Sequence, residues 1–260
     1  VCMCPGGTVC AAASEEGGVV TNGMSLHARD GKNANAAVVV SVDGSDFDND
    51  PVKAVAFQRQ LEQAAYRAGG GEYRAPAQTV GSFLAGGSAL ALDRVEPTYP
   101  RGVTPCDLGS LLPTELGGAL REGLTAFGRK LAAYRAPDAV LTGLETRTSS
   151  PVRLERGKED LQCTGLSGLY PCGEGAGYAG GIMTAAVDGV RCAAELMKNW
   201  APAECPETAA RGLAGPTVGR RCRAVSPLTA ARQQTIKTNR WDKPCQKTNT
   251  ITNITMTLAM

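Results

Sequence analysis

The spacing of apolar residues along the chain predicts one long helix in its first third. Phe57, Leu61 and Ala65 recur at intervals of four and form one helical face of about five turns. Asp50-Pro51 begins this helix, because the aspartate side chain caps free backbone N–H groups and proline suits the first helical position. The run Gly69-Gly70-Gly71 ends it.

A second apolar stripe predicts a helix over residues 114–135, in which leucines and one phenylalanine recur every three or four positions. The β-branched run at residues 36–42 predicts a buried strand, and residues 8–13 and 139–144 predict two more. Residues 73–78 are expected to be extended, because the residue before a proline avoids the helical region. Helices and strands therefore mix along the chain.

Residues 168–183 hold the densest cluster of glycines, in the order Gly-Leu-Tyr-Pro-Cys-Gly-Glu-Gly-Ala-Gly-Tyr-Ala-Gly-Gly-Ile-Met. This order predicts a short strand at 169–172, a glycine turn, and then a helix that runs to about Trp200. Glycine permits positive φ, so several backbone N–H groups can face one ligand. The N-terminus of the helix, with its partial positive charge, points at the same spot. Such an arrangement suits a dinucleotide.

Gly175, Gly177 and Gly180 match the G-x-G-x-x-G pattern of a dinucleotide-binding unit, but glycine is common in this chain. An ordinary unit of that kind has a second strand after the helix, with an acidic residue about 20 positions on. Here the helix runs into Trp200-Ala-Pro202 and no apolar strand follows. The ordinary interpretation is therefore rejected.

Several motifs together resemble a family of uncharacterised FAD-dependent dehydrogenases, which are flavoproteins with two dinucleotide-binding folds. They lie at residues 2–7, 20–25, 73–78, 143–151 and 168–182, and the resemblance covers roughly residues 1–198. In such proteins an N-terminal Rossmann unit binds the ADP half of FAD and a middle domain follows. The chain then returns to complete the flavin site.

The resemblance implies an α/β fold in three parts. Residues 1–150 are expected to form an α+β middle (substrate) domain, truncated at its N-terminus, because the chain opens on Val1 without the phosphate-binding unit. Residues 151–200 are expected to form the strand, glycine turn and helix of a Rossmann-like FAD-binding domain. Residues 201–260 lack a sustained apolar period and follow the end of the resemblance near Lys198, so they are expected to be an irregular or disordered tail.

The resemblance also implies a function and a set of cofactor-binding residues. The function is that of an FAD-dependent oxidoreductase of unknown substrate, in which this chain completes the flavin site. The alternative is a non-catalytic fragment, or a nucleotide-binding module that lacks the ADP-binding half, so catalytic activity is left open. Glu174 is expected to accept hydrogen bonds from the ribityl or pyrophosphate region, and its alternative is an exposed turn carboxylate. The expected FAD-binding residues are Gly173, Glu174, Gly175, Gly180, Gly181, Ile182 and Met183.

Two residues are weak catalytic candidates. Arg147 lies in a polar loop where a guanidinium can bind an acidic substrate or an anionic reduced flavin, and its alternative is an ordinary surface arginine. Cys4, with Cys2, suggests a redox thiol, although C-x-C closes with more strain than C-x-x-C and the Pro-Gly-Gly that follows is typical of a structural loop. The single histidine, His27, is expected at the surface.

Composition excludes some classes of partner. A formal net charge of +2 gives no reason to expect nucleic acid, and no apolar run approaches the length of about 20 residues that a membrane span needs. The ten cysteines are scattered and form no zinc pattern, so no metal is expected. Reduced thiols point to the cytoplasm or another reducing compartment, such as an organelle stroma. The expected partners are flavin, a small-molecule substrate and the missing N-terminal half.

Overall fold

The computed structural model describes residues 3–199 and 252–260. In chain order its strands are β1 (Met3–Cys4), β2 (Gly7–Ala11), β3 (Thr21–Ser25), β4 (Asn35–Val42), β5 (Ala75–Thr79), β6 (Val103–Pro105), β7 (Val140–Glu145) and β8 (Thr252–Ala259). Its α-helices are α1 (Pro51–Ala68), α2 (Val80–Ala85), α3 (Thr114–Gly128) and α4 (Ile182–Asn199), and three 3-10 turns lie at Gly44–Phe47, Leu108–Leu111 and Ala132–Arg135.

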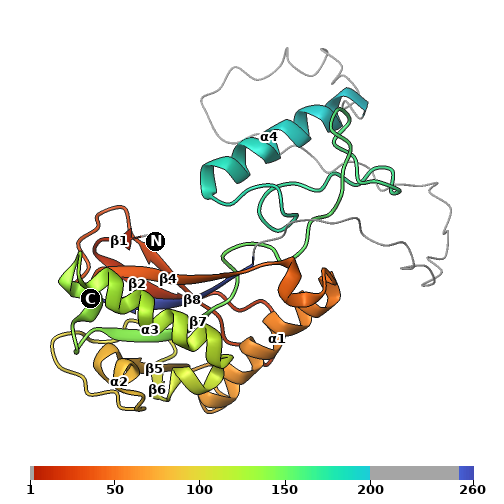
Figure 1. Cartoon of the computed structure of the whole chain (residues 1–260). Helices are drawn as coiled ribbons and strands as arrows, with labels where there is room; N and C mark the ends of the chain where they lie inside the picture. The colour runs from red at the N-terminus through yellow and green to blue at the C-terminus, as the bar shows by residue number, and fades with distance from the viewer. Residues whose placement is uncertain (1–2, 200–251) are drawn as a thin grey trace, which may run out of the picture.

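Six of these strands form one mixed sheet in the order β1-β4-β8-β7-β5-β6 (Figure 1). Its neighbouring strands are antiparallel, except that β5 and β6 run parallel. The strands β2 and β3 form a separate antiparallel hairpin. Helices α1 and α3 pack on the sheet and close a core whose largest fully buried side chains include Phe83, Leu120, Leu124, Leu141 and Leu258. The predicted mixed α/β class is confirmed.

Strand β8 corrects the expectation of an irregular tail. Its residues pair with β4 along their whole length, from Asn35 opposite Ala259 to Val42 opposite Thr252, and with β7 on the other side. Met256, Thr257, Leu258 and Ala259 are buried. Because these four consecutive residues are buried, both faces of this part of β8 are covered. The rest of the expected tail, residues 201–251, lies outside the described residues.

The long helix follows the sequence closely. Helix α1 begins at Pro51, where the Asp50 carboxylate accepts a hydrogen bond of 2.8 Å from the Val52 N–H, and it ends at Ala68. The second helix is shorter than predicted, because α3 ends at Gly128 and a separate 3-10 turn follows at Ala132–Arg135. The side chain of Arg135 folds back onto the space where Gly128 lacks a Cβ, so a side chain at that position would block the turn.

The segment between β7 and α4 is mostly irregular, and α4 lies apart from the sheet (Figure 1). The strand predicted at residues 169–172 is absent from the described structure. Leu169 is half exposed, its carbonyl accepts from the Cys163 N–H at 2.7 Å, and Pro171 has no N–H to offer a ladder. Residues 169–172 therefore join no sheet and are irregular. The helix predicted after the glycine turn is confirmed as α4.

Candidate functional site

A pocket of about 710 Å³ lies where the glycine turn faces the β2–β3 hairpin and the end of β7. This volume is in the range of small-molecule and cofactor sites. Its lining residues are Cys4, Pro5, Asn22, Gly23, Met24, Ser25, Leu26, His27, Arg29, Glu145, Arg147, Thr148, Glu174 and Ile182. Residues from the first 29 positions, from 145–148 and from 174–182 thus converge on one cavity.

Four of the residues singled out from the sequence line this pocket together. Cys4 comes from β1, Arg147 from the loop after β7, Glu174 from the glycine turn and Ile182 from the first turn of α4. The other five candidate residues do not line the pocket: Gly173, Gly175, Gly180, Gly181 and Met183. His27, expected as a surface residue, is exposed and also lines the pocket.

Two kinds of glycine make up the turn before α4. Gly173 and Gly177 have φ of +71° and +80°, a region that disfavours side chains, so the backbone itself requires glycine there. Gly175 and Gly180 differ, because neither has positive φ and a Cβ built on either would meet nothing within 4 Å. Among the described residues, neither conformation nor packing demands glycine at these two positions. The backbone at these two positions therefore lies beside open space.

A buried ion pair fixes the glycine turn to α4. Arg156 donates from Nη2 to Asp188 Oδ1 at 2.6 Å and from Nη1 to Oδ2 at 3.0 Å, and both side chains are nearly buried. The Gly173 N–H donates to Asp188 Oδ2 at 2.9 Å. The Arg156 guanidinium lies 3.7 Å from the centre of the Tyr178 ring, a cation–π distance. Hydrogen bonding from Arg156 lowers the pKa of Asp188, which keeps this carboxylate charged.

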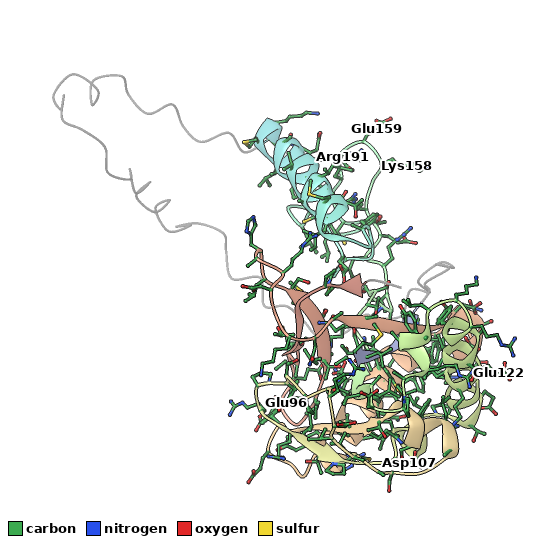
Figure 2. The ribbon with its side chains drawn as sticks, turned by 90° about the vertical axis from the view of Figure 1, so that its left-hand side faces the viewer. Glu96, Asp107, Glu122, Lys158, Glu159 and Arg191 are labelled. Atoms are coloured by element: carbon green, nitrogen blue, oxygen red, sulfur yellow. The ribbon has the colours of Figure 1, made fainter. Side chains whose placement is uncertain are left out.

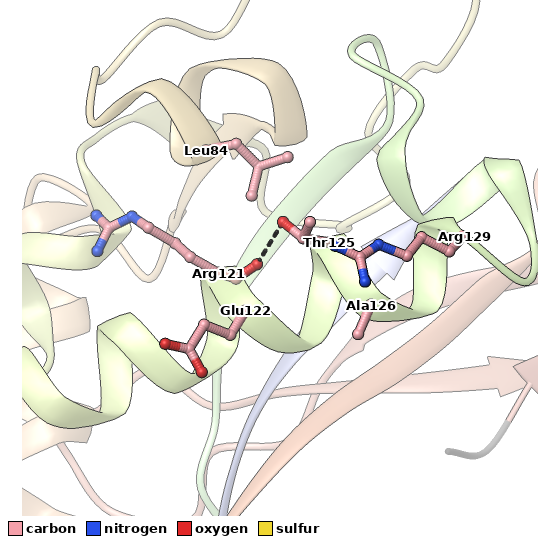
Figure 3. A pocket seen from close by; sticks show the side chains of 6 residues that line it. All are labelled: Leu84, Arg121, Glu122, Thr125, Ala126 and Arg129. Atoms are coloured by element: carbon pink, nitrogen blue, oxygen red, sulfur yellow. Dashed lines mark hydrogen bonds between the residues drawn. The ribbon is translucent and has the colours of Figure 1, made fainter.

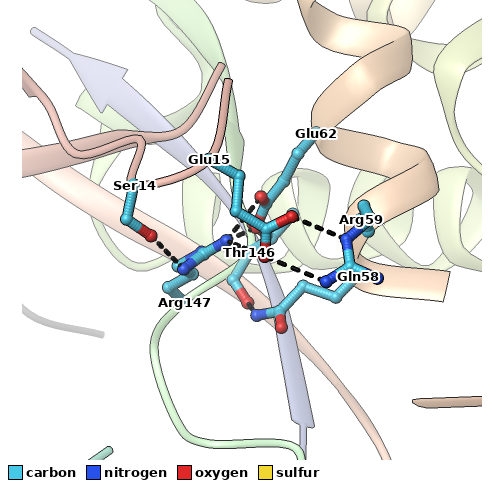
Figure 4. A network of polar contacts seen from close by, with 7 residues as sticks. All are labelled: Ser14, Glu15, Gln58, Arg59, Glu62, Thr146 and Arg147. Carbon is cyan, nitrogen blue, oxygen red and sulfur yellow. Dashed lines mark hydrogen bonds and ion pairs between the residues drawn. The ribbon is translucent and has the colours of Figure 1, made fainter. Parts of the chain in front are cut away.

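Arg147 is held by a buried carboxylate rather than projecting freely into solvent (Figure 4). Its Nε and Nη2 donate to the two carboxylate oxygens of Glu62 on α1, each at 2.8 Å, and Nη1 donates to Ser14. The Thr146 hydroxyl donates to Glu62 Oε1 at 2.7 Å. The Glu62 side chain is 2% exposed, whereas that of Arg147 is 33% exposed and reaches the pocket. The hydrogen bonds to Glu62 raise the pKa of Arg147.

Two more charged residues extend this network. Arg59 donates from Nε and Nη2 to Glu15 at 2.6 and 3.2 Å, and Glu15 Oε1 lies 3.5 Å from Arg147 Nη2 (Figure 4). Hydrogen bonding from Arg59 is the main cause that lowers the pKa of Glu15. The network ties α1 to the loop after β7 and so sets the position of Arg147 at the pocket wall.

Glu145 is a pocket residue that the sequence interpretation missed. It ends β7, its side chain is 6% exposed, and its Oε2 accepts a hydrogen bond of 3.2 Å from the Thr257 hydroxyl. Burial raises the pKa of this carboxyl, and the Thr257 hydrogen bond acts in the opposite direction. The available signal was a carboxylate at the end of the apolar strand predicted over residues 139–144.

Cys4 lies at the pocket wall in a half-buried position, and its thiol donates to the Gly23 carbonyl at 3.6 Å. Its proposed redox partner Cys2 lies outside the described residues. Among the other described cysteines, free thiols are found at Cys10, Cys106, Cys163, Cys172 and Cys192. Within residues 3–199 and 252–260 no group of three or more histidine, cysteine, aspartate or glutamate side chains is arranged to hold a metal ion.

A second hollow of about 400 Å³ lies against α3 (Figure 3). Its lining residues are Leu84, Arg121, Glu122, Thr125, Ala126 and Arg129. Arg121 donates from Nε to the Phe83 carbonyl at 3.0 Å and lies 4.7 Å from the centre of the Phe83 ring. Its guanidinium therefore joins α2 to α3, and the hollow offers no set of convergent groups for a ligand.

Comparisons with known proteins give the family of the chain. A family model described as "FAD-dependent protein, C-terminal domain-like" matches residues 1–148, more than half of the chain. The chain belongs to this family. It is also 49% identical over 200 residues to an uncharacterized protein of Clostridium beijerinckii. That match covers 76% of this chain and 37% of the relative, so the chain spans little more than a third of that protein. None of the described helices is both long and apolar enough to cross a membrane.

Proposed function

We propose that this chain is part of an FAD-dependent oxidoreductase and completes its flavin site. The observation that carries the proposal is the convergence of Glu174 and Ile182, from the glycine turn and α4, with Cys4, Glu145 and Arg147 in one pocket. Membership of an FAD-dependent family supports flavin as the ligand. The substrate is a small molecule that shares this pocket.

Each part of the pocket has a proposed role. Glu174 accepts hydrogen bonds from the hydroxyl groups of the ribityl chain, or lies at the pyrophosphate. Gly175 and Gly180 lie between the lining residues Glu174 and Ile182, and their open backbone lies against the part of the cofactor that extends beyond the pocket. The free N–H groups at the start of α4, from Gly181 to Met183, face the edge of the flavin ring. When bound, flavin accepts a hydride or electrons from the substrate. Arg147, held by Glu62, orients an acidic substrate group.

Helix α4 favours a second proposal, that the chain works as a module paired with an FAD-binding half. One face of the helix is apolar and exposed, with side chains at intervals of four and three at Met183, Val187, Val190, Ala194 and Met197. The opposite face carries the buried Asp188 and Cys192. We name the exposed face the α4 stripe. Because the relative is much longer than the matched region, the occupant we propose for the α4 stripe is the half that binds ADP.

Flavin binding by the purified chain tests the first proposal. Added FAD is expected to bind saturably, as measured by flavin fluorescence quenching and by absorbance after removal of free FAD. Gly175→Val fills open space next to the lining residue Glu174 without disturbing the fold, so it is expected to weaken FAD binding by about tenfold or more, or about 1.4 kcal/mol, at an unchanged melting temperature. Gly118→Ala is the control, because it adds a side chain in open space on α3, a helix that contributes no residue to the pocket lining.

The second proposal predicts a different result. If the chain binds FAD only together with its partner half, it stays colourless alone and turns yellow when mixed with the part of the Clostridium beijerinckii relative outside the matched region. Val187→Glu with Val190→Glu is expected to abolish this pairing, and Lys158→Glu, on the neighbouring loop (Figure 2), is the control that leaves it intact. A chain that binds no FAD in either form contradicts both proposals.

A further inference from the structure

Glu145 is a buried carboxylate at the pocket wall. Unlike Asp188, it makes no contact that holds the glycine turn. Glu145 is 6% exposed and lines the pocket beside Arg147 and Thr148. We infer that Glu145 is the proton-holding group of the pocket and exchanges a proton with the ligand bound there. This inference rests on the proposed function of the pocket as a ligand site.

A bulge in the sheet aims Glu145 at the hairpin side of the sheet. Thr142 pairs with Thr257, but Glu145 pairs with Thr255, so β7 contains one more residue than β8 between these two pairs. Side chains alternate between the faces of a strand, so in an unbroken ladder Glu145 would point away from the face of Thr142 and Thr257. The extra residue returns Glu145 to that face. Bulges of this kind commonly re-aim a side chain beside an active site.

Thr257 holds the carboxylate on this face. Its hydroxyl donates to Glu145 Oε2 at 3.2 Å and lies 3.3 Å from the hydroxyl of Thr21 on β3. Thr21, Thr257 and Glu145 are all buried, so this polar row connects the hairpin to the pocket wall through the middle of the sheet. Thr257 is therefore a positioning residue, supplied by a strand more than a hundred residues further along the chain.

The surroundings of Glu145 favour its protonated form. Burial penalises the charged form of Glu145 and raises its pKa, and the Thr257 hydrogen bond offsets this only in part. The strands packed against β7, namely β3, β5 and β8, bring no titratable group to this face, whereas α1 brings Glu62, which is engaged by Arg147. The other titratable or charged groups around the pocket are Cys4, His27, Arg29, Arg147 and Glu174.

The proposed step transfers one proton and no electrons. The O–H bond of the protonated Glu145 carboxyl breaks, and the proton bonds to a basic nitrogen or oxygen atom of the ligand. In the reverse direction the Glu145 carboxylate accepts a proton from an O–H or N–H group of the ligand. A carboxyl with a raised pKa suits both directions near neutral pH better than an ordinary exposed glutamate does.

Carbon-13 NMR of the full chain labelled at the glutamate carboxyl carbons tests the inference without relying on turnover. We expect one glutamate resonance to titrate above the ordinary glutamate range, and Glu145→Gln to remove it. Glu122 is an exposed residue of α3 that lies outside the pocket lining (Figure 2). Glu122→Gln is the control that leaves the resonance in place. Thr257→Val removes the donor that favours the charged form, so in that variant the Glu145 midpoint is expected to move still higher.

Added FAD then reports whether the proton is coupled to the pocket. We expect FAD to shift the titration midpoint of Glu145. Calorimetry in two buffers measures the protons taken up or released when FAD binds, and we expect this number to differ between Glu145→Gln and the parent chain. A Glu145 midpoint in the ordinary glutamate range, or one that bound FAD leaves unmoved, overturns the inference. A raised midpoint in a chain that binds no FAD contradicts the flavin proposal alone and supports Glu145 as the proton-holding group.

Discussion

Arg156 and Asp188 form a two-point ion pair between the loop after β7 and helix α4, with N–O distances of 2.6 and 3.0 Å. The same aspartate accepts the Gly173 N–H, so one carboxylate holds both the loop and the first glycine of the turn. The turn that presents Glu174 to the pocket is therefore positioned by a residue on the buried face of α4. The exposed face of this helix remains available to a partner.

Asp188→Asn is expected to destabilise this region by about 3 kcal/mol, because it leaves the Arg156 charge nearly buried without its partner. Hydrogen exchange of the α4 amides measures the effect directly. Glu195→Gln removes the exposed pair with Lys198 and serves as the control, for which we expect little change. Equal protection of α4 in both variants would show that the Arg156 pair does not hold the helix.

The same pair predicts a dependence on acid. Hydrogen bonding from Arg156 lowers the pKa of Asp188 below its ordinary value of 3.8. A lowered pKa means that the stabilisation is complete above the ordinary value and is lost as the pH falls through the lowered one. Protection of the α4 amides is therefore expected to collapse only below about pH 4. In Asp188→Asn this acid transition should be missing.

Glu62→Gln tests how Arg147 is positioned. The substitution removes the charge that two Arg147 nitrogens and the Thr146 hydroxyl share, at a site where the glutamate side chain is 2% exposed. We expect a loss of about 3 kcal/mol in the free energy of unfolding, measured by urea denaturation. Arg147→Lys is expected to lower the free energy of unfolding by a smaller amount, because an ammonium group keeps the charge but cannot make the two parallel hydrogen bonds. An unchanged Glu62→Gln variant would contradict the structural role of the pair.

Local sequence signals were sufficient for much of the first 145 residues. The Asp50 cap and the apolar stripe after it predicted α1 to within a residue, and the valine run predicted β4. Both elements are determined by residues close together in sequence. Helix α3 was predicted too long because its end depends on Arg135 crossing Gly128, which is a tertiary contact.

The elements that were missed depend on long-range pairing. Strand β8 lies between β4 and β7, and its partner residues in β4 are more than two hundred positions away. Its alternating threonines follow a long polar stretch, so no local pattern connected them to the sheet. Glu145 was missed for a related reason, since the β7–β8 bulge and Thr257 give this carboxylate its place. Four of the residues that line the pocket with Glu145 could be identified as candidates from the sequence, but the sequence did not show that they lie in one pocket.

Leu258→Ala tests whether β8 is part of the core. Leu258 is fully buried in the central strand, so the truncation is expected to cost about 3 kcal/mol through lost burial and the cavity left behind. Thermal unfolding followed by circular dichroism measures this loss. Met183→Ala is the matched control, because that side chain on the α4 stripe is 75% exposed and its removal should leave the melting temperature nearly unchanged. If both variants melt alike, β8 does not hold the sheet together.

Glu145→Gln is expected to change stability in a direction opposite to that of an ordinary paired carboxylate. Burial raises the folded-state pKa of Glu145 above its ordinary value of 4.5, so folding favours the protonated form. Its contribution to stability is then fully present below pH 4.5 and is lost as the pH rises through the raised value.

Glutamine has the shape of the protonated side chain and never ionises. The variant should therefore match the parent chain in acid and become the more stable of the two as the pH rises toward 8. Each tenfold change in the acid dissociation constant corresponds to about 1.4 kcal/mol of this difference. Melting temperatures at a series of pH values measure it, with Glu122→Gln as the variant that should follow the parent chain throughout. A Glu145→Gln variant that is less stable at pH 8 would mean that the ionised carboxylate is bound in the pocket wall, and that it stores no proton there.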